Sequence, residues 1–254
     1  MAGWQGLQHP QESGGQALKN LDQQFTVDLA GQLEVLEIDK GNDATKIKVT
    51  ASKAMKTENG ATTGLVPAGS VIFVDKKSGK VHLEIEIGTL SKEASEALQV
   101  VLTAHQPESP NDDDVFGTRD QKKIGDSWPV NAVLGAEDLK KHQVIVDPKK
   151  FHGESTLAGV EKINSDECLK INAEVKIDAI EVPLPAGMRT SEGAMTMSAT
   201  GLFPTNFKKP PARDSMAMSV HVVGVGKMGT GDQARDVSFT FDRKQSLTRS
   251  NSYE

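Results

Sequence analysis

The sequence predicts a mainly β protein, organised as one antiparallel curved sheet or as two packed β lobes, with one short helix at about residues 91–105. Apolar and polar residues alternate along several segments, most regularly within 168–182. Side chains that alternate in this way point to opposite faces of a strand, so the pattern predicts a sheet with one dry face and one wet face. Such sheets are usually antiparallel, because buried parallel strands have nearly continuous apolar runs.

The N-terminal part of the chain predicts a leader followed by a β lobe. Residues 1–20 are rich in Gln, Gly and Ser, which is typical of a flexible leader. The first β lobe is expected over residues 21–106, with a turn at residues 39–43 and a later hairpin around Gly79. Its strands are predicted where apolar residues alternate or cluster, at 25–29, 33–38, 47–51, 71–74 and 81–87.

One segment of this lobe has the spacing of a helix. Ser91 can cap the first turn, and Glu93 favours the positive end of the helix dipole. Pro107 cannot continue a helix, so the helix should end near His105, which we expect to be a partly buried packing residue. Apolar residues recur at helical spacing between these limits, at Leu90, Ala94, Ala97, Leu98, Val101 and Leu102. The helix should lie across the sheet.

The remainder of the chain predicts a second lobe. A polar connector is expected over residues 107–126, then a β lobe over 127–243, and then a flexible, basic tail over 244–254. Residues 136–141 predict a helical turn. The strands of this lobe are predicted at 128–134, 144–146, 155–163, 168–182, 194–200, 216–225 and 237–241. No residue-level repeat relates the two halves.

The charge balance and the aromatic content argue against nucleic acid as a partner. The chain of 254 residues has a formal net charge of -6, whereas phosphate binding depends on clustered Lys and Arg. Aromatic residues make up 4% of the chain, which leaves little material for stacking on bases. No segment has the length and apolarity of a membrane-spanning helix. We therefore expect neither nucleic acid nor a membrane span.

The single cysteine, Cys168, allows no intrachain disulfide, and no Cys/His cluster has the spacing of a zinc site. Cys168 stands at the start of a predicted strand, where we expect a small buried or edge residue. The opening residues 1–6 lack the basic and apolar regions of a signal peptide, which taken literally indicates the cytoplasm. No cofactor is expected.

Two motifs suggest an enzyme but lack the required context. Residues 224–229 match G-x-G-x-x-G, yet they lead into another alternating segment instead of a helix, so a glycine-rich hairpin loop is expected. Gly125-Asp126-Ser127-Trp128 is similar to the nucleophile block of GDS-type esterases, but no Asp-x-x-His occurs to supply a base. We interpret this block as a turn whose Trp128 anchors the next strand.

Two polar groups are candidates for metal binding or hydrolysis. Asp112 and Asp114 lie in an acidic run, but the residues that follow lack the ligands of an EF-hand, which leaves a solvated loop or an irregular calcium site. His82, Glu84 and Glu86 share the polar face of one predicted strand, about 7 Å apart by strand rise. Such a row could hold a metal, supply the paired carboxylates of a hydrolase, or be a wet sheet face.

Four methionines form the last candidate site. Met195 and Met197 share a face of one predicted strand, and Met216 and Met218 share a face of the next. If these strands pair, the four thioethers form one patch. Flexible methionine side chains line adaptable apolar grooves, and thioethers also bind Cu(I), while ordinary core packing is the simplest interpretation.

Two short blocks carry a resemblance to a known group of proteins. Phe116-Gly117-Thr118 and Lys123-Ile124-Gly125-Asp126-Ser127-Trp128 resemble segments of uncharacterised exported β-rich proteins of bacteria, which share a domain of unknown function. The order of the strands around these blocks is also similar. The resemblance implies a location in the cell envelope, periplasmic or secreted, in contrast to the opening residues. It implies no activity, because those proteins have none established.

No complete catalytic set emerges from the sequence. Our first hypothesis is therefore a non-enzymatic module that binds an apolar ligand or a protein surface, with the four methionines as its candidate site. The second is a hydrolase that uses the polar strand face at His82, Glu84 and Glu86 or the acidic run. The third is a structural or assembly subunit that pairs through exposed strand edges. The strand order, the ligand and the oligomeric state stay open.

Overall fold

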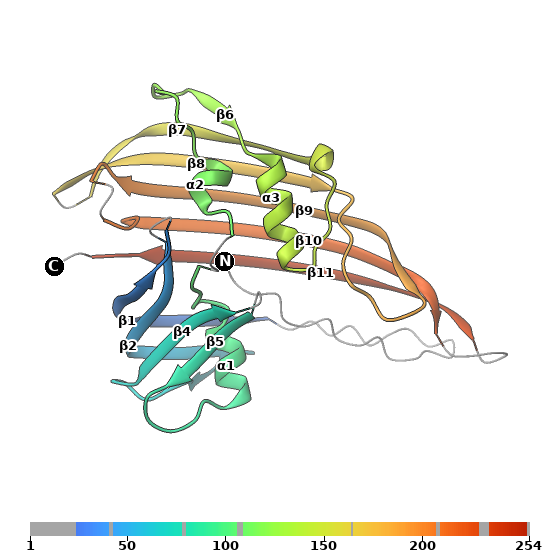
Figure 1. The fold of residues 1–254 in the computed structure, drawn as a ribbon. Helices are drawn as coiled ribbons and strands as arrows, with labels where there is room; N and C mark the ends of the chain where they lie inside the picture. Colours follow the sequence, from blue (N-terminus) through green and yellow to red (C-terminus); the bar gives the residue numbers. More distant parts are fainter. Residues whose placement is uncertain are drawn as a thin grey trace. The chain divides into compact units, whose positions relative to one another are not determined.

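The fold is described from a computed structural model of the chain (Figure 1). The structure describes residues 24–40, 43–77, 80–105, 109–163, 165–206, 209–228 and 234–252, and the expected leader lies outside them. The chain divides into two compact units, residues 1–111 and 112–254, which we call unit 1 and unit 2. Each unit contains one antiparallel sheet and few helical residues, which confirms the predicted mainly β fold.

Unit 1 contains a five-stranded sheet in the order β1-β2-β4-β5, with β3 paired to β2 beside this path. All its strand pairs are antiparallel. The strands are β1 (Phe25–Ile38), β2 (Ala44–Glu58), β3 (Ala61–Gly64), β4 (Val71–Lys77) and β5 (Lys80–Ile85), and the helix α1 spans Lys92–Leu98. The predicted hairpin around Gly79 falls on residues 78–79, outside the described residues.

The core of unit 1 lies between the middle of its sheet and α1. Val49 and Ile47 of β2 stand opposite Ile72 and Val74 of β4, and all four are buried. Leu98 of α1 is fully buried in the same cluster. Burying a large aliphatic side chain contributes roughly 1.5–3 kcal/mol, so this contact between strand face and helix stabilises the unit.

Helix α1 is shorter than the predicted 91–105. Ser91 caps it as expected, because its hydroxyl oxygen accepts a hydrogen bond from the backbone amide three residues later at 3.1 Å. Val100 and Val101 follow the last helical residue, Leu98, and their amides bond to carbonyls three residues earlier instead of four. β-branched side chains disfavour the helix, and the tighter bonds end it as a 3-10 turn.

The strands predicted at 25–29 and 33–38 are a single strand, β1. Its ladder with β2 shifts register between Ala30 and Gly31, which is a β-bulge that interrupts the alternation without ending the strand. A side chain on Gly31 would collide with the carbonyl oxygen of Thr50 on β2, so the close approach of the two strands requires glycine here.

Unit 2 is built on a six-stranded antiparallel sheet in the order β11-β10-β9-β8-β7-β6. Its strands are β6 (Ser127–Pro129), β7 (Phe151–Ile163), β8 (Asp166–Asp178), β9 (Met188–Pro204), β10 (Arg213–Met228) and β11 (Arg235–Ser250), and its helical segments are α2 (Asp112–Phe116), α3 (Ala132–Lys141) and the 3-10 turn η1 (Pro148–Lys150). Figure 1 shows α2 and α3 over one face of this sheet. Among the described residues, no helix is long and apolar enough to cross a membrane.

The alternation predicted for this sheet is clear in the C-terminal half of β8. Val175 and Ile177 are buried, whereas Lys176 between them is exposed. Helix α3 packs on the buried side, where Phe151 pairs with Ile177 and its ring lies against Gly135 of α3 so closely that a side chain on this glycine would collide with it. The apolar face of the sheet is therefore the face that α3 covers.

Helix α3 and its neighbours differ from the prediction. The strand predicted at 128–134 ends at Pro129, because Asn131 begins a helix by accepting a hydrogen bond from the Leu134 amide at 3.2 Å. The predicted helical turn is thus a helix of 10 residues. The strand predicted at 144–146 is reduced to an isolated bridge between Ile145 and Glu181.

Other boundaries of unit 2 also differ from the prediction. Strand β8 stops at Asp178, short of the predicted 182, because Ala179 takes a left-handed conformation with a φ of 61°. Strand β11 extends to Ser250, so much of the predicted tail 244–254 forms a ladder with β10. Part of the predicted connector 107–126 is helix α2, whose first turn carries carboxylates that favour a helix N-terminus.

Candidate functional site

The four predicted methionines lie on one face of the unit 2 sheet. Strands β9 and β10 are antiparallel neighbours, and Met197 is directly opposite Met218. Met195 and Met216 each lie two positions along the same strands, so their side chains are on the same face. Met195 is buried, while the other three are partly exposed. We call this group the methionine face. It is a patch of thioethers that begins in the core and reaches solvent.

Two polar residues of β11 continue this face. Gln245 lies directly opposite Met218, and Arg243 lies opposite Val220, which is the next residue of β10 on the same face. Neighbouring strands are about 4.8 Å apart, so both polar side chains are within one side-chain length of the apolar residues beside them. The face therefore combines an apolar patch with a polar edge.

The polar edge has hydrogen-bond donors that the described residues leave unsatisfied. A guanidinium nitrogen of Arg243 donates to Oε1 of Gln245 at 3.1 Å, but Nε2 of Gln245 is buried with no partner there. Burial lowers the pKa of Arg243 from its usual value, although a guanidinium stays charged at neutral pH. No carboxylate of the described chain forms an ion pair with Arg243. The edge can therefore accept an additional acceptor group.

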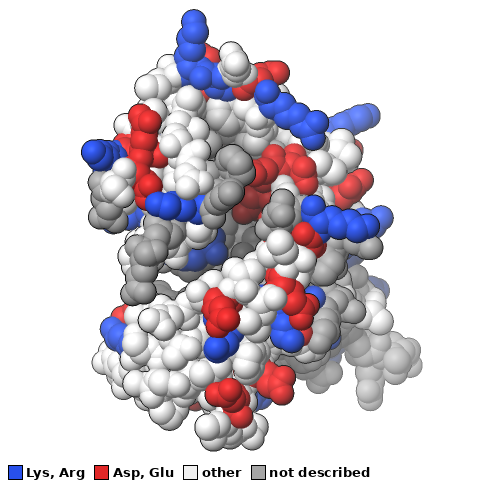
Figure 2. Space-filling model, turned by 60° about the vertical axis from the view of Figure 1, so that its left-hand side comes forward, with Lys and Arg blue, Asp and Glu red and all other residues white. Residues whose placement is uncertain are grey.

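The opposite face of this sheet is polar and carries cross-strand pairs. Nδ1 of His221 on β10 is 2.7 Å from Asp242 on β11, and its Nε2 is 3.9 Å from Glu192 on β9. The hydrogen bond with Asp242 raises the pKa of His221 above its usual value. On the face of the molecule shown in Figure 2, Lys and Arg side chains lie among Asp and Glu side chains. Paired charges of this kind are typical of a solvated surface.

A shallow trough of about 940 Å³ crosses the polar face. Its floor is the backbone of the cross-strand row that contains Met197 and Met218, whose side chains point to the other side. Lys176 lies in one wall and Glu174 in the other. Because its walls are polar side chains, the trough does not enclose an apolar ligand.

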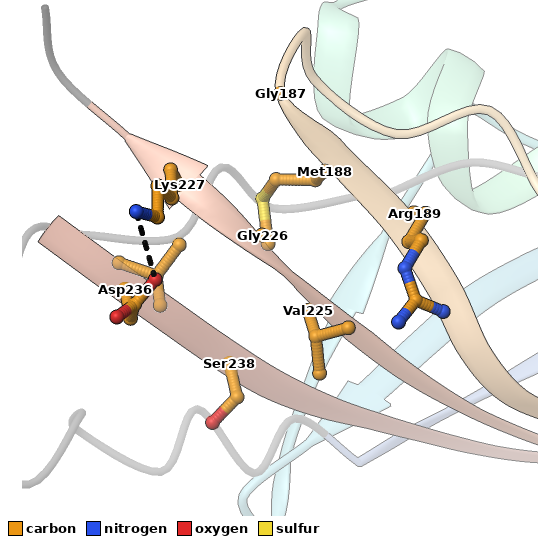
Figure 3. A pocket seen from close by; sticks show the side chains of 9 residues that line it. Gly187, Met188, Arg189, Val225, Gly226, Lys227, Asp236 and Ser238 are labelled. Carbon is orange, nitrogen blue, oxygen red and sulfur yellow. Dashed lines mark ion pairs between the residues drawn. The ribbon is translucent and has the colours of Figure 1, made fainter. Parts of the chain in front are cut away.

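A second hollow, of about 720 Å³, lies where β9 begins and β10 ends (Figure 3). Gly187 and Gly226 line it and let the two backbones approach closely, because a side chain on either would collide with the backbone of the other strand, and Gly187 adopts a φ of 89°, which favours glycine. Nζ of Lys227 and a carboxylate oxygen of Asp236 are 4.0 Å apart in this hollow. Arg189 lines it as well, from an exposed position. The lining is charged and open, unlike the methionine face.

The first two glycines of the G-x-G-x-x-G motif, Gly224 and Gly226, are part of strand β10. Residues 224–228 belong to β10, so the predicted hairpin loop is wrong for this part of the motif, and Gly229 lies outside the described residues. The ring of Phe239 on β11 lies across Gly224, and a side chain on Gly224 would collide with it. Glycine thus allows an aromatic ring to cover the neighbouring strand, and residues 224–228 form no phosphate-binding turn.

The predicted metal or hydrolase residues lie on exposed positions of two separate elements, one in each unit. His82 and Glu84 are exposed on β5, an edge strand of unit 1, and Glu86 follows the end of that strand. Asp112 and Asp114 are exposed in the first turn of α2, where side chains two positions apart do not face each other. Neither group is among the convergent metal ligands found in the described residues.

The esterase-like block is a turn at Gly125 and Asp126 that leads into β6, which begins at Ser127. Oγ of Ser127 is 2.8 Å from Oγ1 of Thr156, so this hydroxyl is paired with another hydroxyl. The buried indole of Trp128 donates a hydrogen bond to the carbonyl oxygen of Phe116 at 2.7 Å. This confirms the interpretation of Trp128 as an anchor. The bond also joins the two blocks that carry the resemblance noted in the sequence.

Cys168 is fully buried, in agreement with the expectation of a small buried or edge residue. Burial raises the pKa of its thiol, and the nearby Asp166 acts in the same direction. Its sulfur lies 3.9 Å from the carbonyl oxygen of Asp166. The thiolate that would act as a nucleophile is therefore disfavoured.

Sequence reasoning missed two sets of residues. Gln245 was assigned to a flexible tail and Arg243 to the end of the last lobe, although both alternate with exposed residues as a strand requires. In unit 1, the structure brings together three metal-ligating side chains, Asp39, Asp43 and His105, which were interpreted as a turn and a packing residue. No local pattern signals this group, because it depends on contacts between residues distant in the sequence.

No family model, curated protein or solved structure matches this chain. The resemblance to exported β-rich proteins of bacteria therefore stays a prediction.

Proposed function

We propose that unit 2 is a non-enzymatic module that binds a small apolar ligand on the methionine face. The observation that supports this is the pairing of Met197 with Met218 at a place where the apolar face of the sheet is only partly covered. Methionine side chains are flexible and polarizable, so they adapt to apolar chains of different shape. Each methylene group that leaves water on this face contributes about 0.8 kcal/mol.

The polar edge of the face suggests the second part of the ligand. Arg243 and the free amide nitrogen of Gln245 can both donate hydrogen bonds, and Arg243 carries a charge without a carboxylate partner among the described residues. Hydrogen bonds between a guanidinium and an anion are about twice as strong as neutral ones. The ligand therefore has an apolar chain and an anionic acceptor such as a carboxylate. Thioether, guanidinium and amide groups supply no nucleophile or general base, which favours binding over catalysis.

Two measurements test this proposal. Native mass spectrometry of the protein purified from its own source should reveal a bound small molecule. Calorimetric titration with laurate and with dodecanol then separates the chain from the anionic group, since the two probes share one chain. Laurate should bind more tightly than dodecanol. No co-purified mass together with no binding of either probe would overturn the proposal.

Variants locate the site. The double substitution of Met197→Gln and Met218→Gln should weaken laurate binding by at least about tenfold, because polar amides replace the thioethers and must lose water when an apolar chain covers them. Arg243→Gln should remove the preference for laurate over dodecanol. Met55→Gln in unit 1 is the matched control, since Met55 is also partly exposed on a strand. Equal affinities of the control and the double variant would place the ligand elsewhere.

A second candidate function is assembly through the edge of unit 1. Strand β1 is an edge strand of its sheet, and Leu33, Val35 and Ile38 are 60%, 48% and 58% exposed on it. An exposed apolar edge strand is a template for pairing with another chain. Light scattering after size exclusion should then report a multimer, and Leu33→Lys should convert it to a monomer. A monomer at all concentrations would exclude this function.

A further inference from the structure

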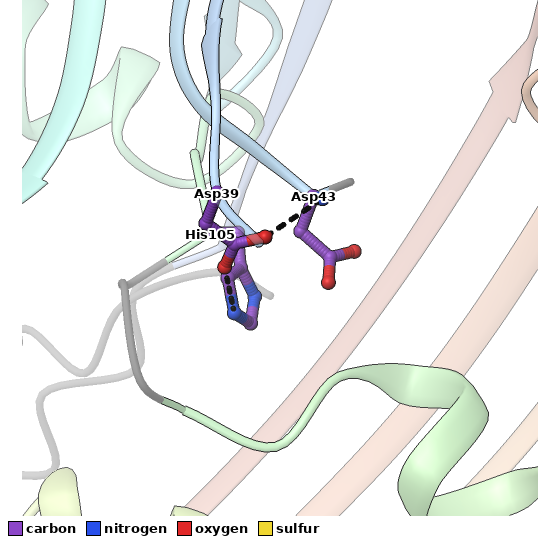
Figure 4. A group of neighbouring side chains, drawn as sticks. All are labelled: Asp39, Asp43 and His105. Atoms are coloured by element: carbon purple, nitrogen blue, oxygen red, sulfur yellow. Dashed lines mark hydrogen bonds and ion pairs between the residues drawn. The ribbon is translucent and has the colours of Figure 1, made fainter. Parts of the chain in front are cut away.

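Three metal-ligating side chains converge in unit 1 at the junction of distant segments. Asp39 follows the end of β1 and Asp43 precedes the start of β2. His105 is brought there by its backbone amide, which donates to the carbonyl oxygen of Ala44 at 2.7 Å. One potential ligand atom of each residue lies within 4.8 Å of the others. Figure 4 shows the two carboxylates and the imidazole around a common space.

Hydrogen bonds hold the two aspartates in place. The amide of Asp39 donates to the carbonyl oxygen of Asp43, and the amide of Asp43 donates to Oδ1 of Asp39, both at 3.0 Å. Nδ2 of Asn111 donates to Oδ2 of Asp43 at 3.1 Å. Groups that orient ligands in this way are typical supports of metal sites, because they reduce the cost of ordering the ligands.

The ion pair within this group is loose, and one of its carboxylates, that of Asp43, has no cationic partner among the described residues. Nε2 of His105 is 3.5 Å from Asp39, which is longer than a charge-assisted hydrogen bond of about 2.7–2.9 Å. These two side chains are only 17% and 18% exposed. Asp43 has no ion pair with a Lys or Arg of the described chain, and the side-chain donor to its carboxylate is the neutral amide of Asn111. A partly buried carboxylate in this position favours a cation.

We propose that Asp39, Asp43 and His105 bind a divalent first-row transition-metal ion such as Zn²⁺. Imidazole and carboxylate ligands suit such ions, whereas Ca²⁺ and Mg²⁺ prefer oxygen ligands and Cu(I) prefers sulfur. Ligand atoms about 2.1 Å from a tetrahedral ion lie about 3.4 Å apart, so small rotations of these side chains complete the site. Three protein ligands leave a fourth position for water or another ligand. This site is independent of the ligand proposed for unit 2.

Zinc titration of the full, untagged chain tests the site. Calorimetry should show one Zn²⁺ bound per chain, with affinity at least about tenfold weaker in Asp43→Asn and in His105→Gln. His82→Gln is the control, because His82 is exposed on β5 of the same unit. It should bind zinc like the unchanged chain. Far-UV circular dichroism of each variant verifies that it is folded. No stoichiometric binding, or equal binding by all variants, would overturn the proposal.

A second measurement needs no substitution. Mn²⁺ broadens NMR signals of nuclei close to it, so sub-stoichiometric Mn²⁺ should selectively broaden the backbone signals of Asp39, Asp43 and His105 in an isotope-labelled chain. Broadening centred instead on His221 and Asp242 of unit 2 would show that these exposed groups are the preferred site and would contradict the assignment to unit 1.

Discussion

The two sheets obey the same alternation but differ in how far their apolar faces are covered. In unit 2, buried residues continue across four neighbouring strands along one row, Phe151, Ile177, Met195 and Val220. Among the described residues of unit 1, the buried ones lie on β2, β4, α1 and the short segment after α1, whereas apolar residues in the second half of β1 are exposed, Leu33 at 60%. The alternation of apolar and polar residues therefore predicts which side chains share a face of the sheet, but it does not predict which part of that face is buried.

Both candidate binding surfaces, the methionine face and the exposed edge of β1, lie where the apolar face of a sheet passes from buried to exposed residues. The methionine face passes from the buried Met195 to the partly exposed Met197 and Met218. On β1, Leu33 and Val35 stand opposite residues of the core, Val49 and Ile47, but nothing among the described residues buries them. Apolar side chains at such margins gain free energy by contacting a further molecule, so these margins are where ligands or partners are expected.

The largest test of this comparison contrasts a covered and an uncovered residue of unit 1. Ile72→Ala should lower the free energy of unfolding by about 2–5 kcal/mol, because a fully buried side chain leaves a cavity. Leu33→Ala on β1 should change it by less than about 0.5 kcal/mol. Urea unfolding followed by far-UV circular dichroism measures both.

Ile177→Ala extends the test to unit 2. It should lower the free energy of unfolding as much as Ile72→Ala does, because the side chain of Ile177 is only 2% exposed. If Leu33→Ala lowered the free energy of unfolding as much as Ile72→Ala, the side chain of Leu33 on β1 would have to be buried in solution. The difference between the two sheets would then disappear.

Alternation in the sequence was enough to predict the faces of the sheets. Val175 and Ile177 are buried as predicted, since the period of a strand is two and one face must exclude water. The bulge at Gly31 joined two predicted strands, because it interrupts the pattern while the ladder continues. Helix α1 ended early at β-branched residues, although Leu102 beyond it stays buried, so apolar spacing overstated the length of the helix.

Some residues of the candidate sites could be predicted from the sequence, and others could not. The methionine face could be predicted because its residues lie on strands that follow each other in the sequence. Arg243 and Gln245 could not, because strong polar character at the end of a chain is also typical of a flexible tail. The grouping of Asp39 and Asp43 with His105 depends on a contact between residues more than 60 positions apart, which one sequence does not reveal.

A smaller change in the free energy of unfolding is expected for the ion pair that joins α1 to the sheet of unit 1. Nζ of Lys56 on β2 lies 2.6 Å from Glu58 and 3.1 Å from Glu93 in the first turn of α1. Lys56→Met should reduce the free energy of unfolding by about 1 kcal/mol, less than for a fully buried pair, because Glu93 stays largely solvated. Urea unfolding at neutral pH measures the loss. Lys92→Met is the control, since Lys92 is 89% exposed and its pair with Glu96 spans 3.8 Å.

The pH dependence sharpens this prediction. Hydrogen bonds with Glu58 and Glu93 raise the folded-state pKa of Lys56 above its usual 10.5. The contribution of Lys56 is therefore fully present below pH 10.5 and is lost as the pH rises through the folded pKa. The stability difference between the unchanged chain and Lys56→Met should be constant from pH 6 to pH 9 and should shrink above about pH 10.5. A difference that grows with pH would contradict the ion pairs.

The smallest expected effect concerns the polar face of unit 2, where His221 is bonded to Asp242. NMR titration should give His221 a pKa above its usual 6.5, because the hydrogen bond favours the charged imidazole. Asp242→Asn should lower this pKa, whereas Asp236→Asn, on the same strand but paired with Lys227, should leave it unchanged. Since the folded pKa is raised, the stabilising contribution is fully present below pH 6.5 and is lost as the pH rises through the folded pKa. If Asp242→Asn left the titration of His221 unchanged, the cross-strand bond would be absent in solution and the polar face would be only a solvated surface.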